Sequence, residues 1–381
     1  MFLRSIGLKR FLSFKDASVD LRPLNVLIGP NASGKSNLIE AIAWLQAAPR
    51  DLVGLVQRGG GIRAWLWLGG AAPSPIASIE CALQEGFLYR LEVSEEARGF
   101  VILGERLQET VSSTPGRKPR IYFDRRSGRV AFGRSLPGRP NGDISTAQSV
   151  LAAFKSPADR TPTTRLGAEF ERIRIYHEFS TGPYAPARTG VASSALKDFL
   201  QDRGDNLAAV LHEMHRIGSD HRIREYLSRL CDQFKDVRTG LDGGILQTYV
   251  EEEGLPEPTP AVRLSDGTLK FLCLMSILLH PRPPALICIE EPELGLHPDA
   301  LQLVGEALIE ASANTQLIVT THSAELVDAL SAVPEAVVVC ERDFDGGTQL
   351  RRLEPKRLKA WLQRYRLGEL WRKGELGGNR W

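Results

Sequence analysis

The chain has 381 residues, of which 43% are hydrophobic and 25% are charged, a composition typical of a folded globular protein. Lys and Arg number 48 against 46 Asp and Glu, so the net charge of +2 excludes a uniformly basic surface for polyanions. The five cysteines form no CxxC pair and imply neither a zinc site nor a disulfide framework. Because no signal peptide or apolar run of membrane-spanning length is present, we expect a cytoplasmic protein without membrane contact.

A strand, a glycine-rich loop and a helix follow one another near the N-terminus. Residues 2–28 predict strands and end in the mostly apolar run Leu24–Ile28, which predicts a buried strand. The segment Gly29–Ser36 follows directly. Helical spacing of the apolar residues in 38–45 then predicts a helix that Pro49 ends.

The middle and C-terminal parts of the chain contain three different patterns of predicted secondary structure. From about residue 59, apolar runs separated by glycine and proline predict a mainly antiparallel lobe, with strands at 77–83, 87–93, 101–107, 121–123 and 130–132. Between about 145 and 235 the spacing predicts helices near 150–154, 196–200, 207–214 and 223–230. After the prolines 256, 258 and 260, helices at 268–280, 300–311 and 324–330 alternate with strands at 285–289, 316–320 and 336–340. This alternation predicts a parallel sheet.

The loop after the first buried strand fits the pattern GxxxxGK[ST] and stands between a predicted strand and a predicted helix, as that pattern requires. Its glycines allow successive backbone N–H groups to point at phosphate oxygens, and the helix N-terminus adds a positive dipole end. Lys35 would reach the β- and γ-phosphates, and the Ser36 hydroxyl would ligate Mg²⁺. The candidate nucleotide-binding residues are Gly29, Pro30, Asn31, Ala32, Ser33, Gly34, Lys35, Ser36 and Asn37.

Two carboxylates follow a second apolar strand. The run 286–289 delivers Glu290 and Glu291 at its C-terminal end, and that edge of a parallel sheet is where ligands bind. Glu290 would hold Mg²⁺, and Glu291 would polarise the attacking water. An acidic pair alone is more often a solvated surface feature, but the preceding strand and the phosphate loop favour the catalytic interpretation.

Three further segments give the chain a specific resemblance. Leu264–Thr268 (LSDGT), Glu290–Pro298 (EEPELGLHP) and Thr320–Ser323 (TTHS) occur in an order that resembles the ABC-type ATPases of the RecF, SMC and OLD group. Within that group the chain looks most like the stand-alone predicted ATPases of the AAA type (AAA_21-like). Its end, from Leu367, also resembles the ends of such ATPases, without an assignable chemistry.

The resemblance implies a fold and a mechanism. It predicts an α/β P-loop NTPase, an ABC-ATPase-like head with a mixed sheet, plus an antiparallel β lobe and a helical insert. Ser265 and the Gly267 amide would contact the γ-phosphate bound by the opposite subunit, so ATP would hold two heads together as an ATP-dependent homodimer. His322 would be the switch histidine that senses the γ-phosphate, and Gly295–Pro298 the loop that contacts the partner.

The expected division of the chain is into four segments: residues 1–60 and 260–381 form the ATPase head, 61–144 the antiparallel lobe, and 145–259 the helical insert and return. Two departures from the pattern matter. Glu290 stands where the group usually has Asp, and Asp266 and Thr268 replace the Gly and Gln of transporter ATPases, which argues against a transporter subunit. No glutamine loop is evident, and Gln57, beside Arg58, is the best candidate.

Three other patterns allow a structural interpretation beside a functional one. His212 and His215 lie three apart on a predicted helix, but without a carboxylate or Cys cluster we expect a solvated face and not a metal site. The run Asp343–Gly347 resembles the DxD of metal-dependent nucleases, although its Asp-Gly steps favour a turn. Basic residues gather at 117–139 and 351–366, where DNA or RNA could bind through phosphates, although charge runs are usually solvated faces.

The sequence therefore predicts an ATPase that uses ATP and Mg²⁺ and dimerises on ATP. Its leading use is in DNA-related processes such as repair, recombination or phage defence. The alternative is an ATP-dependent switch that binds a protein partner, such as an effector nuclease, and no nucleic acid.

Overall fold

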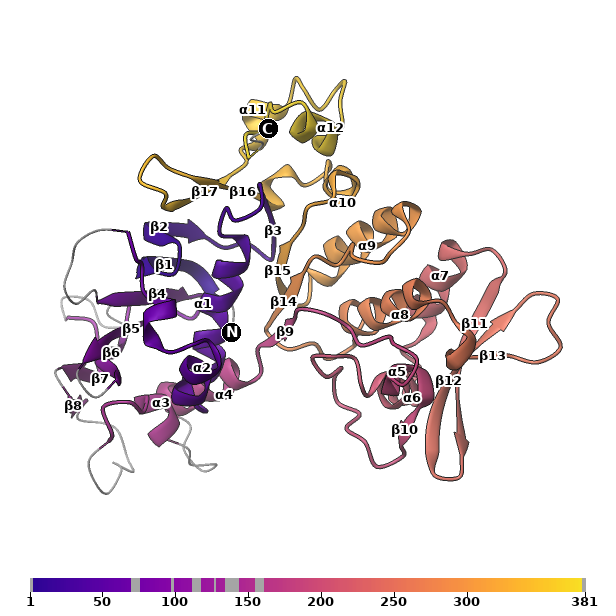
Figure 1. Ribbon diagram of the computed structural model, residues 1–381, viewed down its shortest axis with the longest axis horizontal. Coiled ribbons are helices and arrows are strands. Elements are labelled where there is room, and N and C mark those ends of the chain that lie inside the picture. Colours follow the sequence, from indigo (N-terminus) through magenta and orange to yellow (C-terminus); the bar gives the residue numbers. More distant parts are fainter. Residues whose placement is uncertain are drawn as a thin grey trace.

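The computed structural model describes residues 3–69, 76–96, 99–111, 118–126, 128–133, 144–154 and 161–378. Its strands form three sheets, and the helices lie on and between them (Figure 1). The helices are α1 Lys35–Ala47, α2 Leu52–Arg58, α3 Val150–Ala153, α4 Pro162–Glu171, α5 Pro186–Thr189, α6 Leu207–Arg216, α7 His221–Leu230, α8 Asp266–Leu278, α9 Pro298–Ala311, α10 Ala324–Ala329, α11 Pro355–Leu358 and α12 Leu367–Arg372. Short 3₁₀ helices cover Ile62–Trp65, Ala261–Arg263 and Pro334–Ala336.

A six-stranded sheet in the order β17-β16-β3-β15-β14-β9 forms the centre of the molecule. Its strands pair in parallel except β17, which is antiparallel to β16. The strands are β3 Leu24–Ile28, β9 Arg174–Tyr176, β14 Leu286–Glu290, β15 Gln316–Thr320, β16 Val337–Arg342 and β17 Thr348–Arg352. All five residues of β3 are buried, as expected for a parallel strand covered on both faces.

The two faces of this sheet belong to two different hydrophobic cores. Alternate side chains of β3 divide between them: Leu27 packs with α1 in one core, while Val26 and Ile28 pack with α8, α9 and α10 in the other. α1 is apolar on most of its surface because it lies between the central sheet and a second sheet, and its Trp44 is fully buried. This enclosure fixes the helix that follows the phosphate loop.

The second sheet is antiparallel and has the order β2-β1-β4-β5-β6-β7-β8. Its strands are β1 Leu3–Phe11, β2 Phe14–Asp20, β4 Ala77–Leu83, β5 Phe87–Glu96, β6 Gly99–Glu109, β7 Ile121–Arg126 and β8 Arg129–Phe132. The five strands predicted for the antiparallel lobe are present. β1 pairs with β4, so strands from both sides of residue 60 share one sheet, which the division into segments did not anticipate.

The predicted helical insert contains a β-hairpin as well as helices. β11 Phe234–Asp242 and β12 Ile245–Glu252 pair antiparallel, and short strands β10 Val191–Ala192 and β13 Thr259–Pro260 join β12. The helix expected at 196–200 is wrong. There the Asn206 side-chain amide donates to the carbonyl oxygens of Leu196 and Phe199 and holds the segment as an irregular loop.

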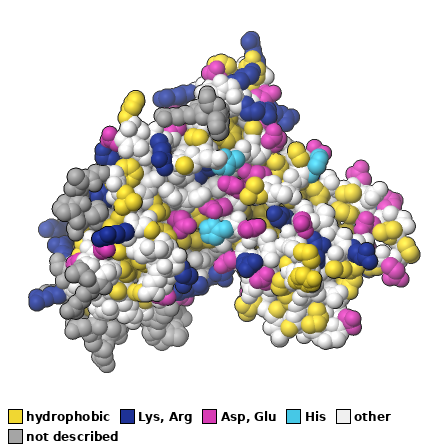
Figure 2. Space-filling view, viewed as in Figure 1, with side chains coloured by type: hydrophobic (Ala, Val, Ile, Leu, Met, Phe, Trp, Pro, Cys, Tyr) yellow, Lys and Arg dark blue, Asp and Glu magenta, His cyan; other side chains and the backbone are white. Residues whose placement is uncertain are grey.

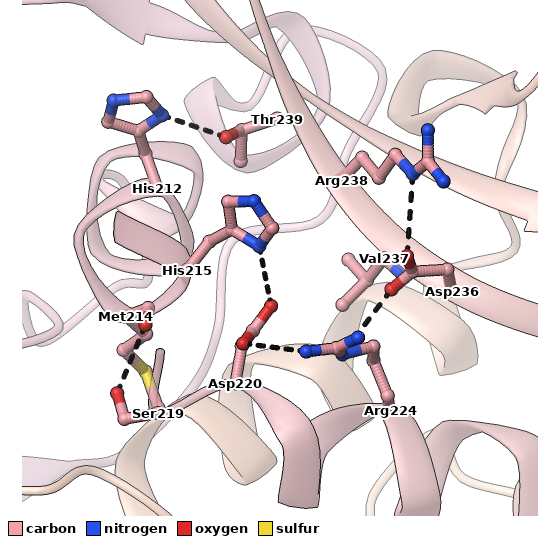
Figure 3. A network of polar contacts seen from close by, with 10 residues as sticks. All are labelled: His212, Met214, His215, Ser219, Asp220, Arg224, Asp236, Val237, Arg238 and Thr239. Atoms are coloured by element: carbon pink, nitrogen blue, oxygen red, sulfur yellow. Dashed lines mark hydrogen bonds and ion pairs between the residues drawn. The ribbon is translucent and has the colours of Figure 1, made fainter. Parts of the chain in front are cut away.

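The histidines of α6 take part in structural contacts (Figure 3). His212 Nδ1 lies 2.9 Å from Thr239 Oγ1, and His215 Nδ1 lies 2.7 Å from Asp220 Oδ2. Asp220 is buried and also accepts from Arg224 on α7. Within the described part of the chain no group of three or more His, Cys, Asp or Glu side chains is placed to hold a metal ion. His215 is exposed, as expected for a solvated face, whereas His212 is half-buried against Thr239.

The run Asp343–Gly347 is the turn between β16 and β17, as expected. Asp343 Oδ1 accepts from the backbone N–H of Gly347 at 2.7 Å, and Asp345 forms an ion pair with Lys15 at 2.5 Å. Among the residues that the structure describes, no helix is long and apolar enough to cross a bilayer.

The first basic cluster includes one arginine that cannot reach a ligand. Arg125 has a fully buried side chain, which donates to the carbonyl oxygens of Gln148 and Ser145 and lies 4.0 Å from the equally buried Glu105. Burial raises the pKa of Glu105, although Ser149 Oγ and the Val150 N–H donate to it. Arg117, Arg134 and Arg139 of the same cluster lie outside the described residues.

Replacing Arg125 should test this structural assignment. Arg125→Leu leaves the buried Glu105 without its counter-charge and the carbonyl oxygens of Gln148 and Ser145 without their donor, so we expect a loss of about 3–5 kcal/mol in the free energy of unfolding. Arg126 is mostly exposed and pairs with Asp124 at 3.0 Å, so Arg126→Leu is the matched control, with an expected effect within about 0.5 kcal/mol. Denaturant unfolding measures both, and equal stabilities would contradict the assignment.

Candidate nucleotide site

The phosphate loop is shaped by glycines that no other residue can replace. Gly29 and Gly34 adopt φ angles of +151° and +100°, and Ala32 also has a positive φ of 60°. A Cβ on Gly29 would lie 2.2 Å from the carbonyl oxygen of Cys340, and one on Gly34 would lie 2.2 Å from Thr348 Oγ1. Close backbone approach as well as backbone conformation therefore demands glycine at both ends of the loop.

Lys35, the first residue of α1, is directed into the loop. Its side chain is buried, and Nζ donates to the carbonyl oxygens of Gly29 at 2.8 Å and Pro30 at 3.0 Å. Burial lowers the pKa of Lys35, while nearby Glu291 and Glu293 oppose that change. The ammonium group thus lies where phosphate oxygens would replace the two carbonyls as partners.

The neighbouring residues are held by the turn between β1 and β2 and by β17 of the central sheet. Asn37 Nδ2 donates to Ser13 Oγ at 2.7 Å, and Thr348 Oγ1 donates to the Ser33 carbonyl at 2.8 Å. Ser36, next to Lys35, is exposed. Its hydroxyl is accordingly accessible to a ligand at the start of α1.

The two predicted carboxylates lie at the C-terminal end of β14. Glu290 ends the strand and pairs in register with Thr320 of β15. Glu291 adopts φ +44°, a left-handed conformation that a non-glycine residue rarely takes, and its N–H donates to the Thr320 carbonyl at 3.0 Å. Such backbone strain concentrates at functional sites.

The donor set fits a divalent cation. Glu290 Oε1 is buried and has no hydrogen-bond partner, although its other oxygen is bonded. An orphaned carboxylate oxygen is costly unless a cation or water satisfies it. Hard oxygen donors such as a carboxylate and the Ser36 hydroxyl are the ligands that Mg²⁺ prefers.

His322 lies beside the second carboxylate. It follows β15, and its Nε2 is 3.5 Å from Glu291 Oε1. Burial and the Lys35 charge lower the pKa of His322, while Glu291 opposes them. The backbone N–H of His322 donates to Glu293 Oε1 at 2.6 Å, so the end of β15 is tied to the loop after β14.

The structure adds His177, which the sequence analysis missed. β9 pairs in parallel with β14, and His177 follows β9 directly, so it reaches the same sheet edge as Glu290. Its Nδ1 lies 3.0 Å from Glu290 Oε2, a contact that raises the pKa of His177. Glu40 of α1 lies nearby, and burial raises its pKa. The only sequence signal was the apolar pair Ile175–Tyr176 before the histidine.

His177 and Glu40 also line a cleft of about 830 Å³. Trp65, Asp202 and Lys270 contribute to its walls, as does Arg58 of α2. On the face shown in Figure 2, histidine and acidic side chains gather at the centre of the molecule, between its two halves. Gln57, the candidate for a glutamine loop, lies on the exposed side of α2 and is not among the residues that line the cleft.

The segment LSDGT begins α8, on the other side of the central sheet from α1 (Figure 1). Ser265 caps the helix by accepting from the Thr268 N–H at 3.0 Å. A Cβ on Gly267 would lie 3.1 Å from the Gly295 carbonyl, so this turn packs against the loop Gly295–Pro298. Among the described residues, no hydrogen bond or ion pair links Ser265 or Gly267 to the phosphate loop.

A family model described as "AAA domain, putative AbiEii toxin, Type IV TA system" matches residues 24–328, more than half of the chain. The chain belongs to this family. The resemblance to ABC-type ATPases of the RecF, SMC and OLD group is confirmed, and the protein is an ATPase of that group.

Curated relatives agree with this assignment. The chain is 26% identical over 379 residues to the Old nuclease of Escherichia phage P2, covering 90% of this chain but only 60% of the relative. It is 22% identical to an ATP/GTP phosphatase of Helicobacter pylori, with 91% of each protein covered. A segment of 46 residues, 12% of the chain, is 48% identical to the DNA replication and repair protein RecF of Thermosynechococcus vestitus, of which it also covers 12%.

Solved structures confirm the fold class. An Smc head bound to the C-winged helix domain of ScpA superposes with a TM-score of 0.56 at 15% identity, covering 94% of this chain and 99% of that one. An Smc head with an extended coiled coil, bound to the C-terminal domain of ScpA derived from Pyrococcus furiosus, gives 0.52 at 13% identity and covers 95% and 98%. The predicted ABC-like P-loop head with an added antiparallel lobe is therefore correct.

Removing the imidazole of His177 should slow hydrolysis without preventing nucleotide binding. His177 supports Glu290 and does not contact the phosphate loop, so we expect His177→Ala to lower kcat by about 10- to 100-fold, with ATP affinity nearly unchanged. Asn can place an N–H near the position of Nδ1, so His177→Asn should recover part of the rate. Steady-state kinetics with a parallel ATP titration measures both, and a wild-type kcat for His177→Ala would contradict the role.

Proposed function

We propose that this ATPase binds Mg²⁺–ATP between two copies of the chain, each supplying one half of the site. Backbone N–H groups of Gly29–Ser36 and the ammonium of Lys35 would hold the phosphates of one nucleotide. Ser265 and the Gly267 amide of the second copy would contact its γ-phosphate. Gly295–Pro298 would lie in the contact between the copies.

The residues at the sheet edge then have separate tasks. Ser36 and Glu290 would hold Mg²⁺, which neutralises charge on the phosphates when bound. Glu291 would orient a water and accept its proton as the water oxygen bonds to the γ-phosphorus. The bond from that phosphorus to the β-bridging oxygen breaks, and ADP and phosphate leave. His322, beside Glu291, would sense the γ-phosphate.

One observation supports the two-copy site. The loop, Glu290, Glu291 and His322 meet at one sheet edge, but the Ser265 turn lies on α8 across the sheet and bonds to none of the described loop residues. The capping Ser265 is exposed and Gly267 is half-buried. A second copy could bring them to the nucleotide without rearranging either core.

Glu291→Gln should separate binding from hydrolysis. The amide keeps the size of the side chain but cannot accept the proton, so we expect kcat to fall by about 10²–10⁴-fold with ATP affinity retained. The bound ATP should then hold the variant as a dimer in size-exclusion chromatography. Lys35→Ala is the control and should bind little ATP and remain monomeric. A Glu291→Gln variant that stays monomeric with saturating ATP would contradict the two-copy site.

For the process that uses this ATPase, we propose DNA repair, recombination or phage defence. The names of the relatives support this: one is a DNA replication and repair protein and another a nuclease. Exposed basic residues remain available in both clusters, among them Lys118, Arg129, Lys356 and Lys359. These could contact phosphates without base specificity.

A protein partner is the second candidate. It is favoured because several arginines of the two basic clusters already have partners within the chain. Arg125 is buried, and Arg126 pairs with Asp124. In the second cluster, Arg352 donates to the carbonyl oxygens of Glu335 and Asp20 and to Asn25 Oδ1. The clusters therefore offer fewer free cations than their sequence indicates, and ATP-dependent closure could instead act on an effector nuclease.

The two uses differ in their response to DNA and salt. A nucleic-acid user should hydrolyse ATP faster with duplex or single-stranded DNA, and the stimulation should decline between about 50 and 200 mM salt as counterions compete. Lys356→Glu with Lys359→Glu should reduce the stimulation while leaving the rate without DNA unchanged. An ATPase rate that is flat with both DNAs at both salt concentrations would favour the protein partner.

A further inference from the structure

The C-terminal segment 367–378 folds back on the nucleotide site, although neither the motifs nor the proposed hydrolysis uses it. α12 begins it, and Gly378 is its last described residue. Leu367, Leu370, Trp371 and Leu376 are buried in the core that holds one face of the central sheet. The segment is therefore an integral part of the head.

The first half of the segment docks on α10, the helix that follows His322. A Cβ on Gly368 would lie 2.0 Å from the Ala324 carbonyl, so α12 and α10 approach as closely as a glycine permits. Asp328 Oδ1 of α10 accepts from the N–H groups of Gly368 at 2.7 Å and Glu369 at 3.2 Å. Arg372 adds an ion pair with Glu325 at 3.1 Å.

The second half reaches the phosphate loop. Arg351 donates to the Leu376 carbonyl at 2.7 Å, and the Gly378 N–H donates to Glu341 Oε1 at 2.5 Å, which fixes the end of the segment to β16 and β17. A Cβ on Gly378 would lie 3.0 Å from Val339 Cγ1 and 3.4 Å from the Cα of Gly29. Gly378 also has a φ of +72°. Gly378 thus lies directly against the first glycine of the loop.

An open hollow of about 360 Å³ lies beside the loop at this contact, within the size range of small-molecule sites. Its walls are Pro30, Asn31, Ala32, Ser33, Glu341, Arg342 and Gly378. Arg342 Nε donates to the Ala32 carbonyl at 2.7 Å, so β16 holds the outer part of the loop as well. Gly29 is therefore enclosed on both sides, by the Cys340 carbonyl and by Gly378.

We propose that residues 367–378 act as a positioning strap, which holds the first turn of the phosphate loop in its binding conformation and ties it to the helix after His322. A preorganised loop binds its ligand more tightly because less conformational entropy is lost on binding. The strap contacts neither Glu290 nor Glu291 and should therefore affect nucleotide affinity and not the chemical step. This inference rests on the proposed ATP site.

Two glycines of the strap's second half provide a matched pair of variants. Gly374 and Gly378 have φ angles of +79° and +72°, so a side chain strains the backbone equally at both. A Cβ on Gly374 meets nothing within 4 Å, whereas one on Gly378 points at Val339 and Gly29. Gly374→Leu thus controls for strain, and Gly378→Leu adds displacement of the loop.

We expect Gly378→Leu to weaken binding of a non-hydrolysable ATP analogue by about tenfold relative to Gly374→Leu, and to raise KM with kcat nearly unchanged. Both variants should have similar melting temperatures. Arg351→Met, which removes the anchor at Leu376 without entering the core, should weaken binding in the same direction by a smaller factor. Isothermal titration, thermal melts and steady-state kinetics supply these quantities.

The outcomes separate this inference from the function on which it rests. Binding of the analogue by the wild-type chain but not by Lys35→Ala would support the ATP site. If Gly378→Leu then binds the analogue as tightly as Gly374→Leu does, the proposed role of the strap is wrong although the ATP site is retained. A fall in kcat at unchanged affinity also overturns the role of the strap. If the wild-type chain and Lys35→Ala bind equally, the proposed ATP site itself is wrong.

Discussion

Register in the parallel sheet is the constraint on which the site depends. Leu27 pairs with Thr320, and Thr320 pairs with Glu290, so the ends of β3, β15 and β14 lie at one level. The phosphate loop, His322 and the two carboxylates begin where these strands stop. Shifting one strand by a residue would exchange its faces between the two cores, so the packing that stabilises the sheet also fixes the site.

The parts of this site that could be predicted from sequence are those where local chemistry leaves few options. Four apolar residues among the five before a glycine loop indicate a buried strand, and close approach to Cys340 and Thr348 requires glycine at positions 29 and 34. Glu290 and Glu291 could be predicted as site residues because they directly follow the apolar run 286–289, which indicates another buried strand. The order of the motifs along the chain then indicated the family, which no single motif could have indicated.

Features that depend on long-range contact could not be predicted. β9 has three residues, too short for any period, and its position beside β14 depends on sheet order alone. β11 buries only Val237 of its nine residues, so alternation gave no strand signal there. Nothing in the sequence indicates that Arg125 and Arg352 are hydrogen-bonded. Arg125 donates to a backbone carbonyl, that of Gln148, which no residue pattern marks, and Arg352 donates to Asn25, which is far away in the sequence.

The same geometry explains why ATP and not ADP should change the state of the molecule. A ligand shifts an equilibrium only by its differential affinity for the two states. In the proposed site, the loop and Lys35 would hold the β-phosphate of either nucleotide, whereas His322 at the sheet edge would meet the γ-phosphate. Discrimination must come from groups that meet the γ-phosphate alone, which in the proposed site are His322 and the Ser265 turn of the second copy. If the strap and the sheet hold the phosphate loop rigid, little conformational entropy is lost when the second copy binds over the nucleotide, so its contacts stabilise the pair more. In the proposed two-copy site, a rigid loop and an incomplete half-site would act together, because contacts to the γ-phosphate would form between molecules and stabilise the closed pair only with ATP.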